Sequence, residues 1–548
     1  MKKLLATMTL IWASAAAMAF EAQLVSDPKN ISSKEYTNPI IHADYSDPDV
    51  TVSADGKTYY MTASSFQCAP GLPILRSTDL VNWELVNHAL DAVPPTDFYD
   101  AAPRHGKGVW APCIREHEGE YFIYWGDPDF GVFMVKTRDP EGEWSEPVLV
   151  KPGKGIIDTT PLWDADGKVY LANGWAASRA GFNSVITISE MNREGTEVTT
   201  KPVMVFDGND GVNHTVEGPK LYRRGEYYYM FAPAGGVATG WQLVMRSKNI
   251  YGPYESRIVM AQGESDINGP HQGALVDAPD GKSWFIHFQD MGPYGRVIHL
   301  NPVEWKEGWP VIGVDKDGDG CGDPVRRYAR PMAADRNVKY TTRQGEGLFE
   351  WHANYSDFYG FPMAGGATRI YGHKLSEGFV NMWEVPNLWL EKFPAERFTM
   401  TAKVKVSAKQ GTEGVASGLI VMGWDYCSLG LVENGDGFTV VMTECRDAEQ
   451  GGKETKTEVG RLKPTRTYEA GLIANVECEV YLRLKVTAGA ECRFSYSTDG
   501  RKWHDCGVTF KARAGKWIGA KAGFFSTVPY GINDRGWIDV ETVDVTID

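Results

Sequence analysis

Short runs of alternating apolar and polar residues, separated by turns, recur through the first two-thirds of the chain. In five places an Asp-Gly, Glu-Gly or Arg-Gly turn precedes an aromatic strand, and the turn glycines are Gly56, Gly119, Gly167, Gly225 and Gly281. Successive glycines lie 63, 48, 58 and 56 residues apart, which leaves room for about four short strands per unit. Repeats of this length predict an all-β fold that begins with a five-bladed β-propeller, whose blades surround a central channel.

The alternation continues in the last third of the chain, but without the repeat. Runs such as Phe398–Val406, Val480–Val486 and Gly536–Ile547 are rich in strand formers, and helix signals are few. This pattern is typical of a β-sandwich. We therefore predict a propeller over residues 36–325, a linker over 326–349 and a sandwich over 350–548.

The N-terminus has the pattern of an export signal. Lys2 and Lys3 precede an apolar run from Leu4 to Trp12, and Ala17-Met18-Ala19 fits a small-x-small cleavage site. The apolar run is too short for a membrane-spanning helix. Residues 1–19 thus predict a signal peptide and an exported protein, periplasmic or secreted, without membrane insertion.

Charge and cysteine content exclude further classes of protein function. The net charge of −15 argues against a nucleic-acid partner, because such binding depends mostly on Lys and Arg. None of the eight cysteines forms a CxxC pair, which argues against a zinc site. Three cysteines fall in the first domain and five in the second, so we expect mostly free, buried thiols.

Three carboxylates occupy similar places in different repeats. Counting back eight to ten residues from each turn glycine reaches the start of the innermost strand of each predicted blade. The residues found there are Asp47, Trp110, Asp158, Glu217 and the pair His271-Gln272. Turn chemistry accounts for Asp47 before Pro48, but not for three carboxylates in one register, and carboxylates are rarely buried unless paired or used. We predict that they form a site on the propeller axis.

Converging carboxylates suit glycoside hydrolysis. One carboxylic acid protonates the leaving oxygen while a second carboxylate acts as base or nucleophile, and neighbouring negative charge with partial burial keeps the proton on the acid. Glu217 has the longest reach and precedes Gly-Pro, so it is the predicted acid. Asp47 is then the base, and Asp158 modulates the pKa of the site and orients its groups. Trp110 and Phe66 are candidates for stacking on a sugar.

These motifs resemble those of glycoside hydrolase family 43. The segments occur in that family's order: residues 44–49, 109–112, 157–162, 216–219 and 269–272. The resemblance implies a five-bladed propeller with an inverting mechanism. Residues 393–398 and the Gly-Phe-Phe-Ser run at Gly523 resemble the concanavalin-like sandwich of its xylosidase and arabinofuranosidase branch.

The resemblance also implies roles, which are carried over by position. Asp47 would be the general base, Asp158 the pKa modulator and Glu217 the general acid. Arg296 would contact the substrate, as would His271, which resembles an axial histidine that in many members lies near a calcium ion or a water. No cofactor is then required for the reaction, although a structural calcium on the axis is compatible with the pattern.

Two positions depart from the family pattern. Cys113 stands where many members have a polar or charged residue, and Lys220 stands where many have histidine. We expect these differences to change subsite details and not the chemistry. The segment from Asp315 to Gly320 looks like the start of a calcium-binding EF-hand loop, but its twelfth position is Arg326 instead of the required Glu, which predicts a surface turn.

The sequence therefore predicts an inverting, exo-acting glycoside hydrolase that acts on a hemicellulose oligosaccharide, with acid and base roughly 6.5–9.5 Å apart. The leading substrate is a terminal α-L-arabinofuranosyl group, from the resemblance of Met291–Arg296 to arabinofuranosidase members. A terminal β-D-xylosyl group, alone or in a bifunctional enzyme, is the alternative. A non-catalytic glycan-binding propeller is the alternative of another class.

The predicted sandwich has two candidate roles. It either braces the propeller and closes one side of the pocket, which we favour, or binds polysaccharide itself. Loops such as Phe525–Arg535 are the candidates for reaching the pocket.

Overall fold

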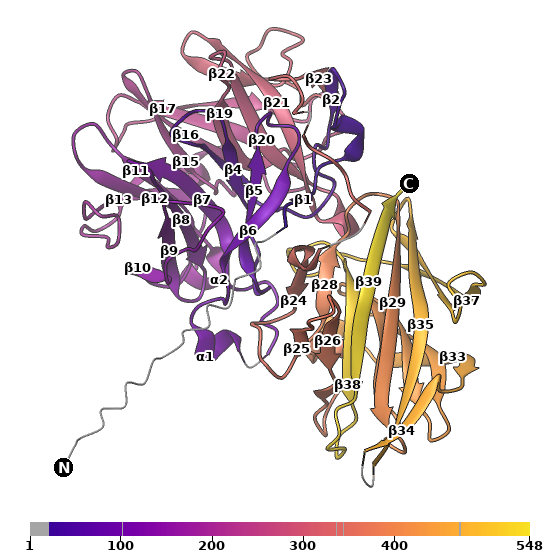
Figure 1. The fold of residues 1–548 in the computed structure, drawn as a ribbon. Helices are drawn as coiled ribbons and strands as arrows, with labels where there is room; N and C mark the ends of the chain where they lie inside the picture. The colour runs from indigo at the N-terminus through magenta and orange to yellow at the C-terminus, as the bar shows by residue number, and fades with distance from the viewer. Residues whose placement is uncertain (1–20, 101, 336, 343–344, 471–472) are drawn as a thin grey trace, which may run out of the picture.

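Two β-rich bodies lie side by side in the computed structural model, a ring of five sheets and a two-sheet sandwich (Figure 1). The structure describes residues 21–548 except 101, 336, 343–344 and 471–472, so the predicted signal peptide lies outside the described residues. The predicted fold class, a five-bladed propeller followed by a β-sandwich, is confirmed.

Each blade is an antiparallel sheet whose first full strand is innermost. Blade 1 contains β3 (Asp49–Val52), β4 (Tyr59–Thr62), β5 (Gly71–Ser77) and β6 (Glu84–Leu90), with β1 (Gln23–Leu24) added at its edge. Blade 2 contains β7 (Trp110–His117), β8 (Glu120–Asp127), β9 (Gly131–Thr137) and β10 (Val148–Pro152). Blade 3 contains β11 (Ile156–Trp163), β12 (Val169–Trp175), β13 (Val185–Met191) and β14 (Val203–Asp207). Blade 4 contains β15 (Lys220–Arg224), β16 (Tyr227–Ala234), β17 (Trp241–Ser247) and β18 (Glu255–Met260), and blade 5 contains β19 (His271–Asp277), β20 (Ser283–Asp290), β21 (Arg296–Lys306) and β22 (Trp309–Ile312).

Burial patterns explain why the blades stack. The middle strand β16 is buried at seven of its eight positions, because neighbouring blades cover both faces of each sheet. The ring is closed by the segment before blade 1, where the Ile40 amide donates to Ile298 of blade 5. Beside it β2 (Glu35–Thr37) pairs with β23 (Arg327–Ala329), so the predicted linker contains a strand that belongs to the propeller side.

The sandwich consists of two eight-stranded sheets. One contains β24 (Phe349–Trp351), β27 (His373–Lys374), β28 (Trp389–Lys392), β30 (Ala416–Met422), β31 (Tyr426–Glu433), β32 (Phe438–Cys445), β33 (Glu454–Leu462) and β38 (Lys521–Val528). The other contains β25 (Gly360–Pro362), β26 (Thr368–Tyr371), β29 (Phe398–Lys409), β34 (Arg466–Ala470), β35 (Ile473–Thr487), β36 (Glu491–Ser497), β37 (His504–Lys511) and β39 (Trp537–Ile547). Alternate residues of β29 are buried, as expected for a sheet with one face on the core.

Helical segments are short. They are α1 (Thr96–Tyr99), α2 (Ala177–Ala180) and the 3-10 turns η1 (Pro28–Asn30), η2 (Gly208–Asp210), η3 (Gly292–Tyr294), η4 (Glu346–Leu348), η5 (Met382–Glu384) and η6 (Ala448–Gln450). None of the helices in the described part of the chain is long and apolar enough to cross a membrane. All eight cysteines are free, and all but Cys321 are buried, in line with the expected thiols.

The two domains meet along a continuous interface. Backbone hydrogen bonds join Ala69 of blade 1 to Trp351 of the sandwich in both directions. His105, from the segment before blade 2, stacks on Trp383 with ring centroids 3.6 Å apart. The sandwich thus packs beside the propeller channel and can contribute residues to a site there.

Candidate active site

A cavity of about 210 Å³ opens at one end of the propeller channel and is lined by residues of all five blades. Six of the seven residues predicted from the sequence line it: Asp47, Phe66, Trp110, Asp158, Glu217 and Arg296. The seventh, His271, is 1% exposed and lies behind Glu217. The structure therefore brings the predicted carboxylates, the arginine and both aromatic residues to one pocket.

A residue with left-handed backbone marks the same point in every blade. These residues are Asp47, Ala111, Asp158, Gly218 and Gln272, with φ between 36° and 60°. In blades 2, 3 and 5 the strand register shifts at this point, as in a β-bulge. Such a bulge re-aims side chains, and left-handed non-glycine residues cost about 1–3 kcal/mol each and gather at functional sites.

This bulge corrects the predicted register. Trp110, Glu217 and His271 are not equivalent to Asp47 and Asp158, because each precedes the left-handed residue of its blade by one position. Counting from the turn glycines missed the offset because the left-handed residue lies nine positions before the turn glycine in blades 1, 3 and 5 but eight in blade 2 and seven in blade 4. The bulge lets both positions face the pocket end of the channel, so all three carboxylates still converge.

Asp47 is held by hydroxyl and guanidinium groups. Its Oδ2 atom accepts hydrogen bonds from Ser46 Oγ at 2.8 Å and Ser64 Oγ at 2.6 Å. Arg296 lies 3.5 Å from Oδ1 and also donates to Ser46 at 2.7 Å. These donors stabilise a negative charge, which suits a base. The sequence did not indicate the two serines, because hydroxyl residues are too common to be distinctive.

Asp158 is a buried carboxylate with two carboxylate neighbours, Glu217 and Asp47. Burial raises its pKa well above the ordinary value, and the charges of Glu217 and Asp47 raise it further. The Gly218 amide, which donates to Asp158 Oδ2 at 2.8 Å, acts in the opposite direction, as does Lys220. The cluster can therefore retain a proton at a pH where an isolated aspartate would lose it.

Glu217 is the most accessible of the three. Its side chain is 37% exposed, and Oε1 lies 3.1 Å from His271 Nε2. Within the described part of the chain, no hydrogen bond reaches its other oxygen, Oε2. A carboxyl with one oxygen held and the other open to the pocket can transfer a proton to a bound substrate.

Aromatic rings form one wall of the cavity. Phe66 and Trp110 meet edge to face with centroids 6.5 Å apart, and Trp110 meets Trp517 of the sandwich at 6.4 Å. Trp175 of blade 3 also lines the cavity. The prediction that residues 525–535 supply the sandwich contribution was wrong: residues 525–528 belong to β38, and the sandwich residue in the cavity lining is Trp517, in the preceding loop.

The two departures from the family pattern lie deeper on the axis. Lys220 is 1% exposed, donates to the Pro112 carbonyl at 2.9 Å and lies 3.7 Å from Asp49. Asp49 also pairs with Arg115 at 2.6 Å. Cys113 donates to the Thr160 hydroxyl, and burial raises the pKa of its thiol to about 12. These side chains form a buried layer behind the carboxylates, and the charge of Lys220 lowers the pKa of Asp158.

The sequence pattern is compatible with a structural calcium on the axis near His271. Calcium prefers six to eight oxygen ligands, whereas His271 offers a nitrogen, Nδ1, and its Nε2 is engaged by Glu217. Within the described residues, the only group of three His, Cys, Asp or Glu side chains placed to hold a metal is Asp315, Asp317 and Asp319. The axial calcium stays a prediction that no finding tests.

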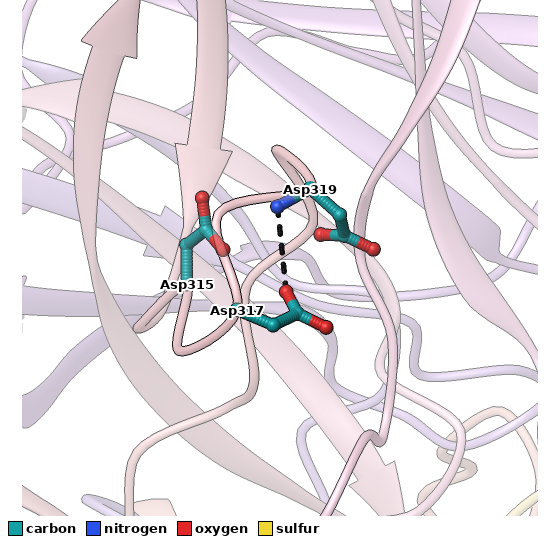
Figure 2. A group of neighbouring side chains, drawn as sticks. All are labelled: Asp315, Asp317 and Asp319. Carbon is teal, nitrogen blue, oxygen red and sulfur yellow. Dashed lines mark hydrogen bonds between the residues drawn. The ribbon is translucent and has the colours of Figure 1, made fainter.

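Figure 2 shows these three aspartates around one surface loop after β22, with the Asp319 amide donating to Asp317. Asp315 already accepts hydrogen bonds from the Gly318 and Gly320 amides and from Lys306. The loop is thus closed by its own backbone donors, as a turn is.

Comparisons with known proteins find matches for both domains. A family model described as "Glycosyl hydrolases family 43" matches residues 36–310, and one described as "Beta xylosidase C-terminal Concanavalin A-like domain" matches residues 346–546. A protein of Xylanibacter ruminicola, provisionally named a β-xylosidase, is 33% identical over 90% of this chain and 86% of its own.

Two further relatives differ in their names. A β-xylosidase of Formosa agariphila is 29% identical over 92% of this chain and 89% of its own. A non-reducing-end α-L-arabinofuranosidase of Bacteroides ovatus is 31% identical over 52% of this chain and 55% of its own. Among solved structures, the GH43 protein BlXynB of Bacillus licheniformis superposes with a TM-score of 0.76 at 22% identity, covering 94% of this chain and 100% of that one. At this identity the likeness concerns the fold alone.

Proposed function

The chain belongs to glycosyl hydrolase family 43, and from that premise we propose that it releases single terminal pentosyl groups from hemicellulose oligosaccharides with inversion of configuration. A β-D-xylosyl group is the first candidate and an α-L-arabinofuranosyl group the second. Membership makes the protein a glycoside hydrolase, and the substrate and the stereochemistry are the parts proposed.

The observation that carries the proposal is the small cavity with three carboxylates at its axial end. Its volume of about 210 Å³ is below the roughly 300–1,000 Å³ of pockets for drug-sized ligands. The size suits one sugar ring, and the Trp517 side chain of the sandwich stands at its wall. A pocket of this kind favours cleavage at a chain end over cleavage within a chain.

The proposed mechanism uses two proton transfers. Glu217 donates a proton to the glycosidic oxygen as the bond between that oxygen and the anomeric carbon breaks. Asp47 accepts a proton from a water whose oxygen attacks the anomeric carbon from the opposite face. Asp158 keeps the Glu217 backbone in place through its bond to Gly218. The products are a free pentose of inverted configuration and a shortened oligosaccharide.

The order of the two sugars differs from the expectation based on sequence alone. The Xylanibacter and Formosa relatives span nearly the whole chain, sandwich included, and both names refer to β-xylosidase. The Bacteroides ovatus relative, whose name refers to arabinofuranosidase, matches about half of the chain. Full-length likeness supports xylosyl more strongly, since the sandwich contributes to the pocket.

The location of this activity is proposed from the N-terminus. Residues 1–19 have the pattern of a signal peptide, and an exported enzyme would meet hemicellulose fragments in the periplasm or outside the cell. Appearance of the cleaved chain in an osmotic-shock fraction or in the medium would test this, and retention of residues 1–19 on a cytoplasmic protein would contradict it.

Paired chromogenic substrates test the activity. The wild type, Asp47→Asn and Glu217→Gln are assayed on aryl β-D-xylopyranosides and aryl α-L-arabinofuranosides, with Glu226→Gln as the matched control. Glu226 lies in the same blade but is an exposed hairpin residue paired with Lys248. Both active-site variants are expected to lose about 10²–10⁴-fold in kcat, and the control to match the wild type.

The leaving group separates the two roles. Loss in Glu217→Gln is expected to shrink as the aryl group becomes a better leaving group, because less protonation is needed, whereas loss in Asp47→Asn is expected to stay constant. NMR of the first-formed sugar gives the stereochemistry, and a retained configuration would refute inversion. Sugar binding without turnover in the wild type would instead favour the non-catalytic alternative.

A further inference from the structure

A loop of the sandwich is docked against the propeller beside the pocket. The Trp517 loop, residues 513–520, connects β37 to β38. Its Ala520 amide donates to the Pro293 carbonyl at 2.8 Å, and its Gly519 amide donates to Asp44 Oδ2 at 2.8 Å. A Cβ atom on Gly519 would lie 2.7 Å from the Gly295 nitrogen. The two backbones are therefore in direct contact.

One carboxylate holds both sides of this contact. Asp44 is 4% exposed, and its other oxygen, Oδ1, accepts the Arg296 amide at 2.9 Å. Gly295 comes so close that a Cβ atom on it would lie 2.4 Å from Asp44 Cγ. Buried carboxylates are rare unless their oxygens are satisfied, and here each oxygen accepts a backbone N–H, one from each domain.

The loop carries a strained and exposed aromatic residue. Trp517 has a φ of 65°, a conformation that bulky side chains rarely adopt. The residue is 49% exposed, although its ring contacts Trp110 and the Arg296 guanidinium lies 5.8 Å from it. Strain of this kind persists only where the surroundings impose it, and it gathers at functional sites. The hydrogen bond from Gly519, two residues after Trp517, to Asp44 supplies that constraint.

We propose that Asp44 is a positioning residue that acts through Trp517: by fastening the Trp517 loop to the propeller, it completes the pocket wall against which the terminal sugar ring packs. This inference rests on the proposed function, since it assumes that a sugar occupies the cavity. It also gives the sandwich a defined part in catalysis, because the wall is absent unless the two domains are docked.

A double-mutant cycle tests the coupling. Asp44→Asn keeps the shape of the side chain, but an amide has one acceptor oxygen, so one of the two backbone N–H groups loses its partner. Trp517→Ala is expected to raise KM about tenfold through lost ring contact, with a smaller effect on kcat. Asp44→Asn is expected to raise KM similarly, and the double variant is expected to be no worse than Trp517→Ala alone.

Two glycine variants test the docking without touching Asp44. Gly519→Ala places its Cβ atom against the Gly295 backbone and is expected to reproduce the Asp44→Asn effect. Gly378→Ala, in another loop of the sandwich, is the matched control, because nothing lies within 4 Å of its Cβ atom, and it is expected to behave like the wild type. Melting temperatures of all variants identify any general loss of folding.

Hydrogen–deuterium exchange of the peptide spanning residues 513–520 follows the docking independently of activity. Asp44→Asn and Gly519→Ala are expected to speed exchange in this peptide, and Gly378→Ala is not. If the wild type cleaves neither pentoside, the proposed function fails while the exchange result still decides the docking. Two results would overturn the inference. One is that the KM increases of Asp44→Asn and Trp517→Ala multiply in the double variant, and the other is faster exchange of the loop peptide with unchanged kinetics.

Discussion

Two buried glutamates on neighbouring sandwich strands should respond in opposite ways to the same substitution. Glu350 of β24 is 3% exposed and contacts the ammonium groups of Lys392 and Lys521, the second of which also lies 3.1 Å from Cys68 of the propeller. Burial alone would raise the pKa of Glu350, but the two ammonium groups lower it to about 2. Glu350 is therefore ionised at every pH at which the protein is handled.

Glu391 of β28 is equally buried, and burial raises its pKa to about 8. It is neutral in the folded protein at pH 7. Because the folded pKa exceeds the ordinary 4.5, the stability linked to this group is present below pH 4.5 and is lost as the pH rises through about 8. Glutamine has no carboxyl group to ionise, so this loss of stability disappears in the variant. Glu391→Gln is therefore expected not to lower the melting temperature and, at pH 7, to raise it.

Glu350→Gln leaves two buried ammonium groups without their shared counter-charge. Breaking a buried ion pair in this way costs about 3–5 kcal/mol, and for a domain of about 200 residues each kcal/mol shifts the melting temperature by about 2–4 °C. We expect a fall of roughly 6–20 °C. The linkage gives a consistent size: a pKa of about 2 instead of 4.5 corresponds to about 3 kcal/mol, present above pH 4.5 and lost as the pH falls toward 2.

Differential scanning calorimetry of the wild type, Glu350→Gln and Glu391→Gln at pH 5, 7 and 9 measures both effects. The Glu350→Gln deficit is expected to be similar at all three pH values, whereas the Glu391→Gln gain is expected to grow from pH 5 to pH 9. An equal fall in both variants at pH 7 would refute the assignment of opposite charge states and would show that both glutamates act only through packing.

Two further predictions concern the axial layer and the metal. Lys220→Met removes a positive charge that lowers the pKa of Asp158, so the pH–activity profile is expected to move upward by about one unit; an unmoved profile with a lower melting temperature would mean that Lys220 acts only in packing. Chelation with EDTA is expected to leave kcat unchanged, because both proton transfers are assigned to Asp47 and Glu217; a loss of kcat that calcium restores would contradict this.

Local sequence patterns were enough to predict much of the fold. Strand alternation and turn spacing depend on neighbouring residues, so five repeats could be counted and a propeller followed by a sandwich could be predicted. The same spacing pointed to Asp47, Asp158 and Glu217, which line one cavity in the structure. Their catalytic roles stay predictions until variants are assayed.

The repeat pattern did not predict the exact register of the innermost strands. A left-handed residue in each blade decides which side chains face the channel, and it places Glu217 one position before its counterparts in blades 1 and 3. A single extra residue in a strand exchanges the two faces of the sheet. Because the hairpins differ in length, a residue count from the turn glycine is shifted, and the composition of the strands gives no sign of the shift.

The chain alone determined its periodicity, the type of its two domains and the three carboxylates, because these follow from residues close together in sequence. Only the tertiary structure decided what surrounds them. Trp517 reaches the cavity from the second domain, and Asp44 binds Gly519 across 475 positions of the chain. Contacts of this kind arise from the docking of two separately patterned domains, and no local pattern of either domain encodes which surfaces will meet.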